Sequence, residues 1–277
     1  MKLKEAAHRS YGLVMVCGPT GSGKTTTLHS LLAHINTADR KIWTVEDPVE
    51  ITQDGLCQVQ VNPRLGLDFP TVLRSFLRAD PDVIMVGETR DAETARTVTA
   101  AALTGHLVFS TMHTNSAVES VLRLIDLDVD PFNFSDALVA VVGQRLVRSL
   151  CHCKQPHVAS DEEIAYLARE YCRESGQDPG EIAARWRKRH GDASGALTLQ
   201  APHGCPDCEN SGYKGRLGVY ELLVNSPALK AAIQRRANSG ELLRLALQEG
   251  MTTLEQDAIE KVLQGQLDLK QVLTSCR

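Results

Sequence analysis

Eight residues near the start of the chain, GPTGSGKT at positions 18–25, limit the folds that the chain can adopt. They follow an apolar run at residues 12–17 that is typical of a buried strand, and they precede residues 26–33, where leucines repeat at helical spacing. In the order strand, loop, helix, the glycines let backbone N–H groups turn toward an anion, and the helix N-terminus adds a partial positive charge. The pattern therefore predicts a phosphate-binding loop in an α/β domain.

The loop also gives roles to individual side chains. Lys24 is expected to contact the β- and γ-phosphates of ATP, and Thr25 to bind Mg²⁺. The alternative is a glycine-rich turn that binds nothing, but all fixed positions of the pattern are filled and both flanks are correct. The predicted nucleotide-binding residues are Gly18, Pro19, Thr20, Gly21, Ser22, Gly23, Lys24, Thr25 and Thr26.

Composition and charge exclude several other classes of protein. The chain has 277 residues, 43% of them apolar, which suits one large domain or two smaller ones. A formal net charge of -4 and 4% aromatic residues argue against a surface built for nucleic acid. No apolar run reaches the roughly 18 residues of a membrane span, and the first residues lack the apolar core of a secretory signal. We expect a cytoplasmic protein without a transmembrane segment.

Acidic residues follow two further strand candidates. One apolar run leads into Glu46 and Glu50, and another leads into Glu88. Ligands of open parallel sheets bind beyond the carboxyl ends of the strands, where these acids would face the phosphates. Gly87 stands where an aspartate is commonest after such a strand, so the acidic role passes to Glu88. Glu88 would orient the attacking water or hold the Mg²⁺ shell through water, and Glu46 could share or take over the role of the base. The alternative is that both acids are solvated carboxylates at strand ends without a catalytic role.

Two histidines flank a fourth strand candidate. His106 stands before residues 107–111, and His113 follows them. A single histidine is more often structural than catalytic, but this pair could sense the γ-phosphate or orient Glu88. The alternation of strands and helices predicts a RecA-like α/β core. The expected elements are strands at 12–17, 41–45, 83–86 and 107–111 and a helix at 92–103.

Taken in order, these motifs resemble the secretion and pilus assembly ATPases of bacterial type II secretion and type IV pili. The resembling segments are residues 18–25, 44–50, 60–63, 73–82, 87–91 and 104–115. The resemblance implies a P-loop ATPase that works as a homo-hexamer at the cytoplasmic side of the inner membrane and drives a pilus or pseudopilus through a membrane platform protein. It places Glu46, Glu50 and Glu88 in acidic boxes, and His106 and His113 in a histidine box.

Arg74 and Arg78 are spaced one helical turn apart, so both could project from one helix face. In similar ATPases, arginines of this region reach the nucleotide of a neighbouring subunit. Such a donor stabilises charge on the transferring phosphoryl group and makes hydrolysis depend on assembly. Without the resemblance, a solvated basic helix face is the preferred interpretation.

Two cysteine clusters predict a zinc site. Cys205 and Cys208 have the spacing of a zinc knuckle, and Cys151 and Cys153 lie upstream across a polar segment. Disulfides are disfavoured in the cytoplasm, which favours a structural Zn²⁺ over a cross-link. The resembling family has C-x-x-C at both ends, whereas the first pair here is C-x-C. Four sulfurs, a site in which His152 or His157 replaces a cysteine, and a degenerate site without metal therefore all stay open.

The motifs divide the chain into three expected parts. These are a RecA-like ATPase core at 1–150, a cysteine-cluster insertion at 151–215, and a return strand with a small helical C-terminal subdomain at 216–277. Resembling proteins carry further domains before the P-loop strand, so the sequence is either a fragment or a natural short form. Secretion and pilus assembly are both open, as are a DNA-transfer ATPase of the same superfamily and a nucleotide-binding module without turnover.

Overall fold

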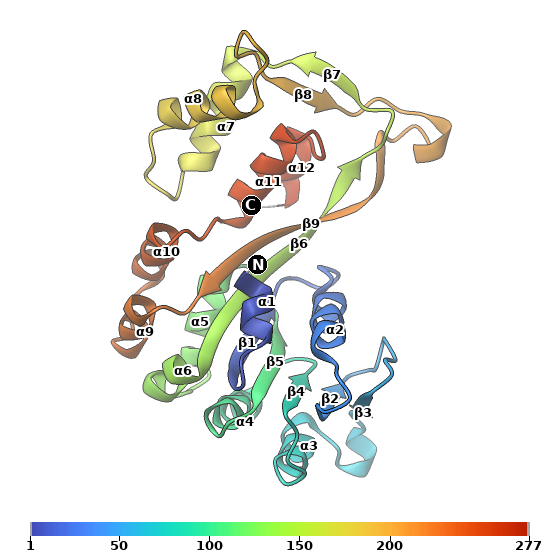
Figure 1. Ribbon diagram of the computed structural model, residues 1–277, viewed down its shortest axis with the longest axis vertical. Coiled ribbons are helices and arrows are strands. Elements are labelled where there is room, and N and C mark those ends of the chain that lie inside the picture. The colour runs from blue at the N-terminus through green and yellow to red at the C-terminus, as the bar shows by residue number, and fades with distance from the viewer. Residues whose placement is uncertain (1, 276–277) are drawn as a thin grey trace. The chain divides into compact units, whose positions relative to one another are not determined.

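The computed structural model describes residues 2–275, which form two compact units (Figure 1). The first unit holds the described residues up to Gln144 together with Leu222–Met251. The second holds Arg145–Glu221 and the described residues from Thr252 onward. Each unit has its own cluster of buried apolar side chains, so the two are described separately below.

A mostly parallel sheet organises the first unit. Its strand order is β3-β2-β4-β5-β1-β6-β9, and the first six strands are parallel to their neighbours. Parallel strands place their carboxyl ends at one edge, where the loops that follow β1, β2, β4 and β5 meet. The strands are β1 (Gly12–Cys17), β2 (Ile42–Glu46), β3 (Leu56–Gln60), β4 (Val83–Val86), β5 (Leu107–Met112), β6 (Leu138–Leu150) and β9 (Tyr213–Val224).

Alternate side chains of β1 enter two different cores. Leu13 and Met15 pack with helices on one face of the sheet, whereas Val14 and Val16 pack with α1 and α2 on the other. Because both faces are covered, β1 is buried at every position, as a continuous apolar run requires. The helices of this unit are α1 (Lys2–Ala7), α2 (Lys24–Ile35), α3 (Phe69–Phe76), α4 (Ala92–Leu103), α5 (Ala117–Asp126), α6 (Pro131–Ala137), α9 (Pro227–Gln234) and α10 (Ser239–Gln248), with a 3₁₀ turn, η1, at Pro63–Leu65.

The second unit is built from helices, a small antiparallel strand pair and the parts of β6 and β9 that lie within Arg145–Glu221. Trp186 is fully buried at its centre and meets the ring of Tyr171 edge-on, with 5.3 Å between ring centroids. Ser160 and Glu163 form a capping box that starts one of the helices. The elements are β7 (Gln155–Val158), β8 (Thr198–Ala201), α7 (Asp161–Cys172), α8 (Pro179–His190), α11 (Leu254–Leu263), α12 (Leu269–Ser275) and a 3₁₀ turn, η2 (Pro206–Cys208).

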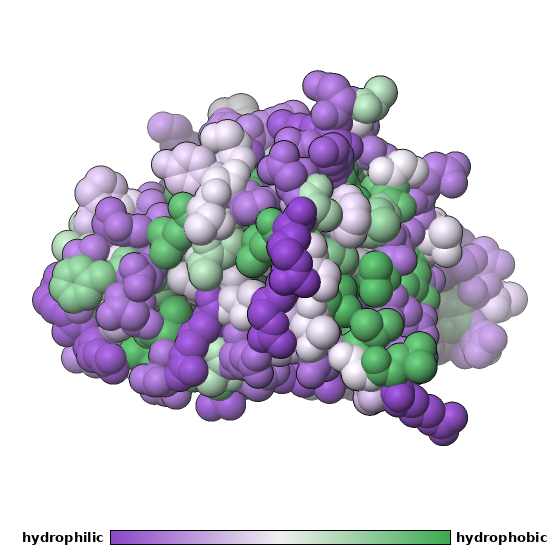
Figure 2. All heavy atoms as spheres, turned by 90° about the horizontal axis from the view of Figure 1, so that it is seen from below, coloured by the Kyte–Doolittle hydropathy of each residue, from purple (hydrophilic) through white to green (hydrophobic). Residues whose placement is uncertain are grey.

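The surface carries scattered apolar side chains among polar ones, and Figure 2 shows this mixture on the face seen from below. The large exposed apolar residues come from separate stretches of the chain, such as Leu65, Phe132 and Val158. Within residues 2–275, the helices are all too short or too polar to cross a membrane.

The α/β class with a parallel sheet and a cysteine cluster is confirmed. The expected bounds of β1, β4 and α4 agree with the structure, whereas β6, β7 and β8 were not expected. The expected return strand is β9, which has 12 residues and begins at Tyr213. The C-terminal helices form as expected, but α9 and α10 belong to the first unit, and α11 and α12 to the second. The three-part division at 150 and 215 stays a prediction.

Candidate active site

A polar cavity of about 430 Å³ lies at the carboxyl edge of the sheet in the first unit. Four successive structural segments contribute to it: the glycine loop after β1, the acidic segment after β2, the turn after β4 and the segment at the end of β5. Its lining residues are Thr20, Gly21, Ser22, Gly23, Lys24, Thr25, Thr26, Leu28, Glu46, Asp47, Pro48, Glu50, Met85, Gly87, Glu88, Arg90, Thr111 and His113. Motifs separated in sequence thus converge on one cavity.

The glycine loop is held in a conformation that side chains would obstruct. Gly18 has a φ of 151°, and a Cβ there would overlap the carbonyl oxygen of Gln144 and the Ser22 hydroxyl. Gly23, at φ 85°, caps the N-terminus of α2 in the left-handed region. Gln144 donates to the Ser22 carbonyl at 2.6 Å and accepts from the Thr27 hydroxyl at 2.7 Å, which ties the loop to β6. Sequence analysis missed Gln144, because it lies 122 residues from Ser22.

Lys24 is the buried cation of the cavity. Its Nζ donates to the carbonyl oxygens of Gly18 at 2.8 Å and Pro19 at 3.1 Å. Burial lowers the pKa of its ammonium from the ordinary value, while the charge of Glu88 acts in the opposite direction. Neutral carbonyl groups compensate a buried charge only in part, so phosphate oxygens are the better partners for this ammonium.

Glu88 is a buried carboxylate with one oxygen left unpaired. Its side chain is about nine-tenths buried, and Oε1 forms an ion pair with Arg90. Oε2 is buried without a hydrogen bond, and His113 Nε2 lies 3.6 Å away. Burial and then the charge of Lys24 lower the pKa of His113, so its imidazole is neutral at pH 7. An unsatisfied buried acceptor that faces a polar cavity suits a water molecule.

The other two predicted acids differ from Glu88 and from each other. Glu50 is exposed at the cavity rim. Glu46 is 2% exposed, and its oxygens accept from Thr44 and Gln58 and contact His29. Glu46 is therefore anchored in the wall of the cavity. Sequence analysis identified the carboxylate but not the partners contributed by α2 and β3.

Gly87 explains why the acid after β4 is displaced by one position. A Cβ at Gly87 would lie 3.3 Å from both Glu46 Cα and the Val45 carbonyl oxygen. Its own N–H donates to that carbonyl at 2.8 Å, and its carbonyl oxygen accepts from the Thr111 hydroxyl at 2.5 Å. The ends of β2 and β4 approach so closely that a side chain here would press on the backbone of the neighbouring strand. The first position with room for an acid is Glu88.

Within one chain, the structure does not bring the two histidines together, and their shared role stays a prediction. His113 follows β5 and lines the cavity, whereas His106 precedes β5. A strand of this length separates its ends by about 20 Å. His106 Nδ1 instead lies 3.1 Å from the Ala101 carbonyl oxygen.

The two predicted arginines also lie outside the cavity. Arg74 is exposed on α3 and forms an ion pair with Glu93 at 2.5 Å. Arg78 is exposed just after this helix and donates to the Ser75 hydroxyl at 3.4 Å. Neither guanidinium is among the groups that line the cavity of its own chain.

The second unit brings four cysteines together. The Sγ atoms of Cys151, Cys153, Cys205 and Cys208 all lie within 4.8 Å of one another. The sulfur of Cys205 lies 3.8 Å from that of Cys151 and 3.7 Å from that of Cys208. Four sulfurs at about 2.3 Å from a tetrahedral Zn²⁺ are separated by about 3.8 Å, so this donor set fits zinc. His157 contacts Glu163 and lies outside the cluster.

Hydrogen bonds and crowding give the sulfurs unequal pKa values. Burial and neighbouring sulfurs raise the pKa of Cys153 to about 12, despite a backbone N–H that lowers it. Burial also raises the pKa of Cys208, but the backbone N–H groups of Cys205 and Gly212 donate to its sulfur and lower the pKa to about 6. A thiolate therefore forms more readily at Cys208 than at Cys153.

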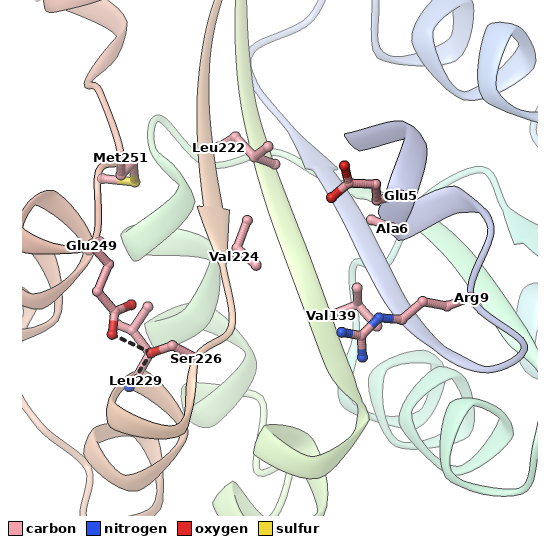
Figure 3. Close-up of a pocket in the computed structure, with 11 residues that line it drawn as sticks. Glu5, Ala6, Arg9, Val139, Leu222, Val224, Ser226, Leu229, Glu249 and Met251 are labelled. Atoms are coloured by element: carbon pink, nitrogen blue, oxygen red, sulfur yellow. Dashed lines mark hydrogen bonds between the residues drawn. The ribbon is translucent and has the colours of Figure 1, made fainter. Parts of the chain in front are cut away.

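A second cavity of about 370 Å³ in the first unit has different chemistry (Figure 3). Apolar side chains such as Val139, Leu222 and Met251 line most of it. Its Ser226 hydroxyl already donates to Glu249 at 2.7 Å. It lacks the glycine loop and the buried acid, so the first cavity is the candidate active site.

A parallel sheet, a glycine loop that leads into a helix at Lys24, and a buried acid beside it define a P-loop α/β protein. Comparison with known proteins is more specific. The chain belongs to the family described as Type II/IV secretion system protein, which it matches over residues 1–274.

The similar proteins come from two bacterial systems, type IV pilus assembly and type II secretion. The chain is 44% identical over 268 residues to the type IV pilus assembly ATPase PilB of Pseudomonas aeruginosa, covering 96% of this chain and 44% of that protein. It is 42% identical over 266 residues to the type II secretion system ATPase E of Vibrio cholerae, covering 96% and 48%. The chain thus spans a little under half of each relative.

A solved structure of the pilus retraction motor PilT with bound ADP is similar over 99% of this chain and 63% of that one. The TM-score is 0.67 and the identity 28%. The Legionella pneumophila ATPase DotB has a TM-score of 0.66 at 24% identity, covering 98% of this chain and 62% of that one, and supports the fold alone.

Proposed function

We propose that this chain is an ATP-hydrolysing motor domain that powers type II protein secretion or the assembly of a type IV pilus or pseudopilus. The observation that carries the proposal is the convergence of Lys24 and Thr25 with the unpaired Oε2 of Glu88 in one cavity. Relatives named as ATPases and a similar motor with bound ADP support the same conclusion.

The residues of the cavity divide the work of hydrolysis. Backbone N–H groups of the glycine loop hold the phosphates, and Lys24 exchanges its carbonyl partners for β- and γ-phosphate oxygens. Glu88 Oε2 accepts a hydrogen bond from a water molecule and then takes its proton as the water oxygen attacks the γ-phosphorus. The bond to the β–γ bridging oxygen breaks, and ADP leaves with the electron pair. Thr25 and the acids provide hard oxygen ligands for Mg²⁺, which neutralises charge on the phosphates when bound.

Assembly completes the site in this proposal. Arg74 and Arg78 do not line their own cavity, and their exposure makes them available to a neighbouring subunit. A guanidinium from the next chain of a homo-hexamer would stabilise the phosphoryl transition state. The motor would act on a platform protein of the inner membrane from its cytoplasmic side, without binding nucleic acid.

Zn²⁺ in the cysteine cluster would have a structural role. Four thiolate ligands close a tetrahedral site and leave no position for a reactive water. The cluster joins a segment near residue 151 to one near residue 208, so a bound ion would stabilise the second unit.

The proposal is tested by steady-state phosphate release from the purified chain over a range of protein concentrations. Lys24→Ala should lower turnover by at least about 100-fold, because it removes a donor to the developing charge. Arg78→Ala should abolish the rise of turnover with concentration while leaving nucleotide binding intact. The matched controls are Lys41→Ala and Arg64→Ala, both at exposed positions outside the cavity.

Two results would overturn the proposal. If the wild-type chain forms a hexamer but releases no phosphate, it would be a module that binds nucleotide without hydrolysing it. Stimulation by DNA and not by a platform protein would favour a DNA-transfer ATPase.

A further inference from the structure

We infer that His29 is a positioning residue for Glu46, held in one tautomer by Gln53 and by Glu46 itself. The inference rests on the proposed ATPase function and extends it to the wall of the same cavity. His29 is 4% exposed and lies on α2, the helix that begins with Lys24 and Thr25. A buried imidazole on this helix faces the acid at the end of β2 instead of the apolar core.

The geometry joins His29 to Glu46. His29 Nε2 lies 3.1 Å from Glu46 Oε2, and the contact is buried. Glu46 Oε1 accepts from the Thr44 hydroxyl at 2.7 Å and from Gln58 Nε2 at 3.0 Å. A carboxylate has about four lone-pair directions, so these three contacts leave one for the cavity. His29 provides the contact to Oε2. Without this contact, the carboxylate of Glu46 could rotate, or Oε2 could accept from a water molecule.

Gln53 and Glu46 favour the same tautomer of His29. With its amide nitrogen toward the ring, Gln53 donates to His29 Nδ1 at 3.0 Å and to the His29 carbonyl oxygen at 3.3 Å, while its amide oxygen accepts from the Ala33 N–H at 3.1 Å. A neutral imidazole that accepts at Nδ1 carries its proton on Nε2. The hydrogen bonds therefore run from Gln53 to His29 and from His29 to Glu46.

The arrangement gives Glu46 a fixed direction. At metal sites, hydrogen-bond partners that orient the metal ligands are worth about 10- to 100-fold in metal affinity or activity. Because the phosphates are held by the glycine loop, loss of the His29 donor should lower kcat and leave KM for ATP unchanged. A general loss of packing around α2 would change both constants.

Two substitutions at position 29 separate positioning from packing. Glutamine can place an amide N–H where Nε2 of histidine lies, whereas asparagine is too short to reach Glu46. His29→Gln should keep kcat within about 2-fold of wild type, and His29→Asn should lower it about 10-fold at constant KM. His34→Asn controls for the cost of asparagine on the same helix, because His34 is exposed on α2. Equal kcat values for the two His29 variants would overturn the inference.

A spectroscopic measurement keeps the inference testable if His29→Asn fails to fold or the chain shows no turnover. Long-range ¹H–¹⁵N correlation of ¹⁵N-histidine-labelled protein, with His29 assigned through His29→Gln, reports which ring nitrogen carries the proton. The neutral Nε2–H form is expected at pH 8, and it should persist in Gln53→Ala, because Glu46 Oε2 can only accept from Nε2–H. A neutral Nδ1–H form would overturn the inference. Absence of turnover with an Nε2–H imidazole would count against the ATPase proposal and not against this hydrogen-bond arrangement.

Discussion

The cavity at the sheet edge and the cysteine cluster both gather polar groups from distant segments, but they leave them in different states. In the cavity, Glu88 Oε2 is buried without a donor, and Lys24 is satisfied only by backbone carbonyls. In the cluster, Cys208 accepts backbone N–H groups, and the four sulfurs lie within 4.8 Å of one another. The difference teaches that buried polar groups without hydrogen-bond partners indicate a site that binds and turns over a substrate. Polar groups that already contact one another indicate a site that stabilises the fold.

The largest expected effect comes from opening the cluster. Cys208→Ser removes one of the four ligands, so bound zinc should be lost and the unfolding midpoint of the chain should fall by about 5 °C or more. Nucleotide affinity, set in the first unit, should stay unchanged. Metal content, thermal unfolding and nucleotide titration of one sample make the test, with exposed Cys57→Ser as the control. Unchanged stability together with lost turnover would reverse the roles assigned to the two sites.

A smaller loss of stability is expected when a side chain is added at Gly87 in the wall of the cavity. Gly87→Ala places a Cβ 3.3 Å from Glu46 Cα and should destabilise the chain by about 1 kcal/mol. Turnover should fall because Glu46 and Glu88 shift apart, while zinc content should not change. Urea unfolding and phosphate release measure the two effects. Gly240→Ala, where a Cβ would have room on α10, should be neutral or stabilising, and equal losses in both variants would refute the close approach at Gly87.

The smallest effect concerns pH. Burial and then Lys24 hold the pKa of His113 below its ordinary value of about 6.5. Its neutral form therefore contributes stability that is complete above about pH 6.5 and is lost as pH falls through the lower folded pKa. His113→Gln cannot take up this proton, so the variant should lose less stability than wild type between pH 7.5 and pH 5.5. Urea midpoints at the two pH values measure the difference, and parallel losses would contradict the lowered pKa of His113.

The sequence predicted what short segments encode. The strand before the glycine loop, Lys24, and the acid after β4 each follow from a contiguous pattern, and the structure brings these side chains together. The cysteine pairs were also predicted, and their convergence answers whether a C-x-C pair can complete a set of four sulfurs.

Long-range partners escaped prediction for a physical reason. Gln144 supports the glycine loop across 122 residues, and His29 meets Glu46 through the packing of α2 on the sheet. β6 was missed because Gly143, Gln144 and Arg145 interrupt its apolar run. A local pattern carries no information about which distant backbone group such residues will satisfy.

The central claim is that the cavity of the first unit hydrolyses ATP through Glu88. The most direct measurement compares phosphate release by wild type and Glu88→Gln at matched occupancy by ATP and Mg²⁺. The amide keeps the size of the side chain but loses the acceptor charge, so turnover should fall by about 100-fold or more while nucleotide affinity is retained. Equal turnover by the two proteins would contradict the claim.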